Sequence, residues 1–179
     1  MAKINKKYLY IKNLLTKTEL KIAHKYAIIR HKSNINDFDE TQTFLGETCY
    51  YSDPLMELLL EKLMPRVEKE LGQPLWPTYS FLRVYNKFSK LEKHTDRESC
   101  EISVSCTLGR DKEWPLYVGN KKIVIHPGDG LLYYGGEVEH WREEYDGDYQ
   151  AQVFFHYVKK DGKYANEKFD RRQYLGLSK

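Results

Sequence analysis

The feature that most constrains the fold is a series of short strand-like segments between residues 79 and 158. In residues 101–108, apolar and polar side chains alternate without a break. Because residues two apart in a strand project from the same face, this segment predicts a strand with one apolar and one polar face. Many short strands separated by turns are typical of a sandwich or barrel, so we predict a mainly β core. The other predicted strands of this core are 80–85, 114–118, 122–125, 131–134 and 149–158.

Turn residues separate these segments. Gly119 and Asn120 lie between two strand-like segments and predict a hairpin. Residues 126–130 read His-Pro-Gly-Asp-Gly and predict a tight turn, and the polar residues 86–93 predict a loop that leads to His94. The tail from residue 159 is polar until Tyr174, which indicates a loop or a short closing helix.

A first helix is predicted to follow a short β-prone segment at residues 8–11. Thr16 and Glu19 have the spacing of a capping box, in which each side chain bonds the backbone N–H of the other residue. The helix should then run to about residue 30. Its expected buried face consists of Leu20, Ala23, His24, Ala27 and Ile28.

A second helix is predicted after a predicted strand at residues 47–51. Asp53 and Pro54 form an N-cap with proline at the first helical position, and Gly72 ends the pattern. Pro65 lies inside this pattern, so we predict a kink or a break near Leu63. The expected apolar stripe consists of Leu55, Leu58, Leu59, Lys62, Leu63 and Val67.

Length and composition indicate one reduced, cytoplasmic domain. The 179 residues fit a single domain over 1–179, with helical support at about 16–72 and the β core at about 79–158. No stretch approaches 18 consecutive apolar residues, which argues against a membrane span and a signal peptide. Three cysteines without a Cys-x-x-Cys spacing indicate neither a disulfide framework nor a zinc knuckle.

The net charge does not favour a nucleic-acid partner. A formal charge of +3 is small, and acidic and basic residues are mixed along the chain. The fifteen tyrosines are explained equally well by a packed barrel and by a nucleic-acid surface. Nucleic acid is therefore kept as an alternative partner, and the sequence does not indicate an oligomeric state.

One pattern suggests metal chemistry. His94 and Asp96 are two residues apart, so in an extended segment both can point into one cavity, and His140 can approach from a distant strand. Two histidines and one carboxylate on one side of a metal form the ligand set of non-heme Fe(II) oxygenases. The competing interpretation is that His94 and Asp96 form a hydrogen-bonded pair on a solvated strand.

The sequence resembles the Fe(II)- and 2-oxoglutarate-dependent dioxygenases, in particular their prolyl-4-hydroxylase-like branch. Four features match in order over about residues 79–158. They are the strand 83–86 with the loop that follows it, the His94-Thr95-Asp96 motif, the turn and strand at 127–134, and His140 with an aromatic strand behind it.

The resemblance implies a fold, cofactors and an activity. The fold would be a double-stranded β-helix, also called a jelly roll (cupin-like), with the N-terminal helices packed outside. The implied metal ligands and catalytic residues are His94, Asp96 and His140, and the implied cofactors are Fe(II), 2-oxoglutarate as cosubstrate and O2. The implied activity is hydroxylation of an unactivated C–H bond in a small-molecule or peptidyl substrate, with a prolyl residue or a free amino acid as the candidates.

The chain departs from the family at the cosubstrate site. The family has a basic residue about ten positions after the distal histidine, which pairs with the remote carboxylate of 2-oxoglutarate, whereas residues 148–152 read Asp-Tyr-Gln-Ala-Gln. A buried carboxylate needs a charged partner. Arg142 is the first candidate because it can share the face of His140, Arg83 is the second and Arg97 the third. Tyr85 is the predicted additional hydroxyl donor to the cosubstrate.

Two other functions remain open from the sequence. The missing base favours a non-catalytic metal-binding jelly roll, and the tyrosines and basic residues allow an oxygenase that acts on nucleic acid. Among the other histidines, His156 is the one that could face the cavity, because it shares strand parity with Gln150 and Gln152. His24, His31 and His126 are expected to be core or surface residues.

Overall fold

A computed structural model describes residues 7–33 and 47–177 of the chain. No helix of these residues is long and apolar enough to cross a membrane. The helices are α1 (Lys17–Ser33), α2 (Pro54–Leu71) and the short 3-10 segments η1 (Glu98–Cys100) and η2 (Ala165–Arg171). The strands are β1 (Tyr8–Ile11), β2 (Thr48–Tyr51), β3 (Leu75–Asn86), β4 (Leu91–His94), β5 (Ile102–Arg110), β6 (Leu116–Val118), β7 (Lys121–Ile123), β8 (Gly130–Tyr133), β9 (His140–Arg142) and β10 (Tyr149–Lys159).

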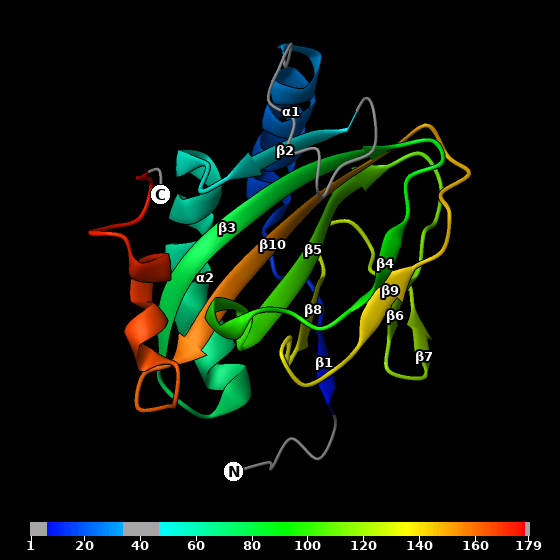
Figure 1. The fold of residues 1–179 in the computed structure, drawn as a ribbon. Helices are drawn as coiled ribbons and strands as arrows, with labels where there is room; N and C mark the ends of the chain where they lie inside the picture. Colours follow the sequence, from blue (N-terminus) through cyan, green and yellow to red (C-terminus); the bar gives the residue numbers. More distant parts are fainter. Residues whose placement is uncertain (1–6, 34–46, 178–179) are drawn as a thin grey trace.

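The strands form two antiparallel sheets (Figure 1). The six-stranded sheet has the order β1-β8-β5-β10-β3-β2, and the four-stranded sheet has the order β4-β9-β6-β7. Strands that are distant in sequence lie side by side in both sheets, as the jelly-roll topology requires. The predicted mainly β fold with flanking helices is confirmed. β1 and β2 belong to the large sheet, so this sheet also includes strands from the N-terminal part of the chain.

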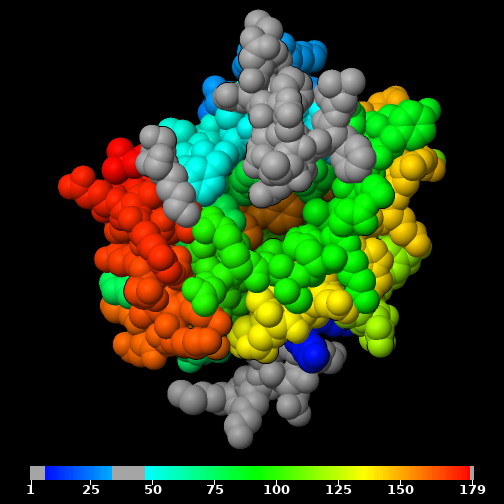
Figure 2. Space-filling view, viewed as in Figure 1, coloured from blue at the N-terminus to red at the C-terminus, as the bar shows by residue number. Residues whose placement is uncertain are grey.

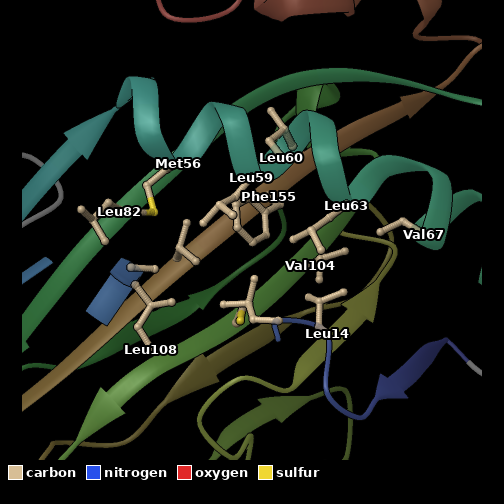
Figure 3. Packing of buried hydrophobic residues seen from close by; sticks show 14 of the residues in the cluster. Leu14, Met56, Leu59, Leu60, Leu63, Val67, Leu82, Val104, Leu108 and Phe155 are labelled. Atoms are coloured by element: carbon tan, nitrogen blue, oxygen red, sulfur yellow. The ribbon is translucent and has the colours of Figure 1, made fainter. Parts of the chain in front are cut away.

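The large sheet has one apolar and one polar face, as the alternation in residues 101–108 predicts. Val104 and Phe155 pack against α2 on the outer face, together with Leu82 of β3 (Figure 3). α1 and α2 cover this outer face (Figure 1), which confirms that the helices lie outside the jelly roll. The opposite face carries buried polar side chains, which are Ser103, Ser105, Thr107, Gln150, Gln152 and His156. A jelly roll whose inner face is polar and buried is suited to binding a ligand.

Helix α2 begins and ends where the sequence predicts, but its continuity at Pro65 and its buried face differ from the prediction. The Asp53 side chain accepts hydrogen bonds from the next backbone N–H groups, and Gly72 ends the helix with φ of 71°. Of the predicted kink or break near Leu63, the break does not occur, because one helix runs through Pro65. Pro65 is exposed, and so is Glu61, whose carbonyl loses its helical partner and can bond to water instead. In the apolar stripe, Leu58 and Lys62 lie on the exposed side, while Met56 and Leu60 are buried.

The predicted loop before His94 is partly a strand. β4 covers Leu91–His94 and pairs with β9, with Leu91 opposite Arg142 and His94 opposite His140. The predicted strands at 114–118 and 122–125 are shorter than expected and end in the hairpin β6–β7. The tail closes over the large sheet through η2, and Arg172 connects it to α2.

The ion pair between Arg172 and Glu57 gives a stability prediction. The two side chains are 3% and 2% exposed, and Arg172 Nη2 lies 2.7 Å from Glu57 Oε1. Arg172→Ala would leave a buried carboxylate without its cation, so we expect the free energy of unfolding to fall by about 3–5 kcal/mol. Urea denaturation measures this change. The control is Lys112→Ala, because Lys112 pairs with Asp146 where both side chains are exposed, and it should cost less than about 1 kcal/mol. Equal effects of the two substitutions would contradict the prediction.

Candidate active site

A cavity of about 450 Å³ lies between the polar face of the large sheet and the strands β4 and β9. Figure 2 shows a hollow in one face of the molecule, with β10 visible at its bottom. The volume is in the range of pockets that hold small ligands. The described residues that line it are Tyr51, Tyr79, Phe81, Arg83, Tyr85, Leu91, His94, Asp96, Arg97, Tyr133, His140, Phe154 and His156.

The structure brings His94, Asp96 and His140 together at this cavity. Asp96 Oδ1 lies 3.5 Å from His94 Nε2 and 3.4 Å from His140 Nε2. One donor atom from each residue lies within 4.8 Å of the others, a spacing that can hold a metal ion. The antiparallel register of β4 and β9 explains the convergence, because it places His94 directly opposite His140. The arrangement is that of two imidazoles and one carboxylate on the same side of one point.

Both histidines are held in the same tautomer. His94 Nδ1 lies 2.7 Å from the carbonyl of Glu92, and His140 Nδ1 lies 3.0 Å from the carbonyl of Val138. Because a carbonyl only accepts, each Nδ1 must carry the proton and donate it. The Nε2 atoms therefore direct lone pairs at the space beside Asp96, which is the form in which histidine binds a metal.

Asp96 is fixed by groups that the sequence does not indicate. Its Oδ2 accepts a hydrogen bond of 2.7 Å from Ser103 Oγ, and its backbone N–H donates to the carbonyl of Gly135. A side chain at Gly135 would place its Cβ 2.2 Å from Asp96 Oδ2, so the position requires glycine. Burial raises the pKa of Asp96, but the contacts with His140 and His94 outweigh this effect and hold the pKa well below its usual range. The carboxylate is thus ionised, with Oδ1 directed at the histidines.

Arg142 lies on the same buried face of β9 as His140, and not on the outer face beside Glu143 and Glu144. Its guanidinium donates through Nη1 to the backbone carbonyl of Trp114. The guanidinium carbon lies 4.7 Å from the centre of the Trp114 side-chain ring. Its Nε and Nη2 atoms are buried and have no partner among the described residues. Burial lowers the pKa of Arg142 to about 10, so the group is still cationic at neutral pH. It is a buried cation with two unused donors.

Tyr85 and Gln150 are two further buried residues of the inner face. The Tyr85 ring packs 4.9 Å from Trp114, which also contacts Arg142, and Gln150 is the register partner of Tyr85 across β10 and β3. Tyr85 Oη and Gln150 Oε1 are buried and have no partner among the described residues. Gln150 stands ten positions after His140, where the family has its basic residue. Buried polar groups are nearly always hydrogen-bonded, so these unpaired groups indicate a place for a polar ligand.

The other two candidate arginines have carboxylate partners. Arg83 is 5% exposed and its Nη2 lies 2.6 Å from Glu47 Oε2. Arg97 donates to both oxygens of the buried Asp170, at 2.7 and 2.9 Å, at the half-exposed edge of the cavity. Both line the cavity, whereas Arg142 is the arginine without a carboxylate partner in the described part of this region.

Comparisons with known proteins were made from sequence and from structure. No family model matches the chain, and no curated protein matches it in sequence. The structure is similar to EctD from S. alaskensis with bound Fe, with a TM-score of 0.68 and 15% identity, over 86% of this chain and 73% of that one. It is also similar to a Pseudomonas putida prolyl-4-hydroxylase, with a TM-score of 0.67 and 14% identity, over 87% of this chain and 94% of that one.

A third similar structure is the viral collagen prolyl hydroxylase from Paramecium bursaria Chlorella virus-1, solved as a complex with 2-oxoglutarate. Its TM-score is 0.66 at 12% identity, over 88% of this chain and 98% of that one. The chain therefore has the fold of these hydroxylases, which is the fold that the resemblance in its sequence implies.

Proposed function

We propose that the chain is an Fe(II)- and 2-oxoglutarate-dependent dioxygenase that hydroxylates an unactivated C–H bond. The observation that carries the proposal is the convergence of His94 Nε2, Asp96 Oδ1 and His140 Nε2 at a cavity, together with the buried and unpaired Arg142 on the same face of β9 as His140. The first group suits a divalent metal, and the second suits a carboxylate. The hydroxylase fold of the similar structures supports the same assignment.

The metal site fits Fe(II). His94, Asp96 and His140 would hold the ion, with the carbonyls of Glu92 and Val138 fixing the two imidazoles. Such backbone partners orient the ligands before the metal arrives. The set also accepts Mn, Ni or Zn, so ligand type alone does not select iron.

The cosubstrate site fits 2-oxoglutarate. The guanidinium atoms Nε and Nη2 of Arg142 lie on one edge of a planar fork, which matches the two oxygens of a carboxylate. Tyr85 Oη is unpaired beside it and would donate to the same group. The remote carboxylate would thus satisfy three buried polar atoms that have no partner among the described residues. Arg83 is the alternative partner, but Glu47 already neutralises it.

The chemistry supplied by the bound iron and 2-oxoglutarate is oxidative decarboxylation coupled to hydroxylation of a C–H bond. The residues of the chain would bind and orient the metal, the cosubstrate and the substrate, and they would exclude water from the cavity. Tyr79, Phe81 and Phe154 form aromatic walls beside the metal ligands, which leaves an apolar space for the carbon to be hydroxylated. A small molecule or a single residue of a peptide is the substrate that a cavity of about 450 Å³ admits. The similarity to prolyl hydroxylases makes a prolyl residue the first candidate, and a free amino acid is the second.

An anaerobic titration tests the proposal. The metal-free protein is titrated with Fe(II) and then with 2-oxoglutarate, and we expect stoichiometric binding of each and a visible charge-transfer band when both are present. Exposure to O2 should then produce succinate. Iron binding without the band would instead favour the non-catalytic metal-binding jelly roll. Failure to bind iron would refute both.

A further inference from the structure

His156 has a position that the proposed iron and cosubstrate sites do not explain. It lies on β10 opposite Ser103 of β5, is 5% exposed, and lines the same cavity as the metal ligands. Its ring packs against Tyr79, with the ring centres 4.5 Å apart, and is stacked with Phe154 at 6.4 Å. Burial between two aromatic rings favours the neutral imidazole.

Hydrogen bonds fix the tautomer of His156. Ser103 Oγ lies 2.7 Å from Asp96 Oδ2 and 3.0 Å from His156 Nδ1. The carboxylate of Asp96 can only accept, so the single hydroxyl proton of Ser103 is donated to it. Ser103 Oγ must then accept from His156, and Nδ1 carries the imidazole proton. The remaining nitrogen, Nε2, is therefore an acceptor.

The acceptor has no partner in the described residues. Within the described residues, the ring forms its hydrogen bond through Nδ1 and not through Nε2, and it borders the cavity. Neighbouring polar groups of the wall are already engaged. Tyr79 Oη lies 3.1 Å from Cys100 Sγ, and both Tyr51 and Arg97 donate to Asp170. Within the described wall beside the metal ligands, His156 is thus a neutral acceptor that borders the cavity between the rings of Tyr79 and Phe154.

A second metal site at His156 is the competing explanation. Asp96, Cys100 and His156 each offer a ligand atom within 4.8 Å of the others. Burial raises the pKa of the Cys100 thiol, and Tyr79 contacts its sulfur. A buried, protonated thiol does not bind a metal well, because the thiolate is the ligand. His156 Nδ1 is also occupied by Ser103, which leaves the acceptor interpretation.

We propose that His156 Nε2 accepts a hydrogen bond from an N–H or O–H group of the substrate, next to the carbon that is hydroxylated. The substrate class is then a molecule or residue with an apolar or planar body and an uncharged donor. Substrates with an anionic group at this end are disfavoured, because Arg97 is already neutralised by Asp170. That the bound molecule is a substrate rests on the proposed function, whereas the acceptor at Nε2 and the tautomer of His156 do not depend on it.

Two measurements test this inference without iron or 2-oxoglutarate. The first is a long-range ¹H–¹⁵N correlation spectrum of protein with labelled histidines. We expect His156 to show a protonated Nδ1 and an unprotonated Nε2. A protonated Nε2 would overturn the proposal. This result does not depend on iron binding. A failure of the proposed function would appear in the charge-transfer titration instead, so the two failures can be distinguished.

The second measurement uses phenol and anisole, two flat probes that differ in one O–H donor. We expect the protein to bind phenol about five- to tenfold more tightly than anisole, the size of one neutral hydrogen bond. His156→Phe keeps a ring and removes the acceptor, so it should bind both probes equally. His126→Phe, which changes an exposed histidine outside the cavity, should keep the difference. The proposal would be overturned if the unchanged protein binds both probes equally, or if the difference survives His156→Phe. It would also be overturned if neither probe changes the ¹⁵N signals of His156.

Discussion

Asp96→Ala is expected to abolish stoichiometric Fe(II) binding while leaving the protein folded. Asp96 supplies the carboxylate of the ligand group, and its Oδ1 lies within 3.5 Å of both histidine Nε2 atoms. The two neutral imidazoles can still bind a divalent ion, but they cannot replace the lost ligand and its negative charge. Since the Asp96 side chain borders the cavity and not the apolar core, its loss should change the free energy of unfolding little. Anaerobic Fe(II) titration and a thermal melt measure the two effects.

Ser103→Ala is the matched control for this prediction. It keeps the ligand atom Oδ1 of Asp96 but removes the hydrogen bond to Oδ2. Loss of such an outer partner typically weakens metal binding by roughly 10- to 100-fold, so binding should be weakened but still measurable. Full iron affinity in Asp96→Ala would refute the assignment of Asp96 as a ligand.

The fold could be predicted to the extent that local patterns determine it. The alternation in residues 101–108 places Val104 and Ser103 on opposite faces of a strand, and in the structure Val104 lies in the apolar core while Ser103 bonds to Asp96. The polarity of residues 86–93 predicts a loop and misses β4, because the residues of this strand are partly exposed and show no alternation of apolar and polar side chains. Its pairing with β9 is a tertiary effect. The break predicted near Leu63 does not occur, because tertiary packing overrides the low helix propensity of Pro65. The backbone hydrogen bond that proline removes lies on the side of the helix that faces water.

The site shows the same division. The spacing of His94 and Asp96 indicates their shared direction, and the register that brings His140 beside them follows from the fold. The partners of the side chains could not be predicted in this way. Arg83 and Glu47 are 36 positions apart, and no local pattern shows that they form an ion pair. The roles of Ser103 and Gly135 around Asp96 likewise depend on contacts between strands.

Arg142→Met is expected to have opposite effects on the free and the bound protein. Without ligand, Arg142 is a buried cation with two donors that lack partners in the described residues. Burying an unpaired charge is costly, and methionine removes this charge at a similar volume, so the free energy of unfolding should not fall. With 2-oxoglutarate, the substitution removes one partner of a buried charge pair. That loss typically costs about 3–5 kcal/mol, which raises the dissociation constant by roughly two orders of magnitude or more.

Thermal melts with and without 2-oxoglutarate, in the presence of Zn(II), separate the two effects. A ligand at about 100 times its dissociation constant stabilises a protein by about 2.7 kcal/mol, and Arg142→Met should lose this stabilisation. Zn(II) binding itself should be unchanged, because Arg142 is not a metal ligand. Arg97→Met is the matched control, since Arg97 borders the cavity of the metal ligands but is paired with Asp170, and it should keep the stabilisation. If Arg142→Met keeps 2-oxoglutarate affinity while Arg83→Met loses it, the carboxylate is held from β3 instead, and Glu47 must give up its partner when the cosubstrate binds.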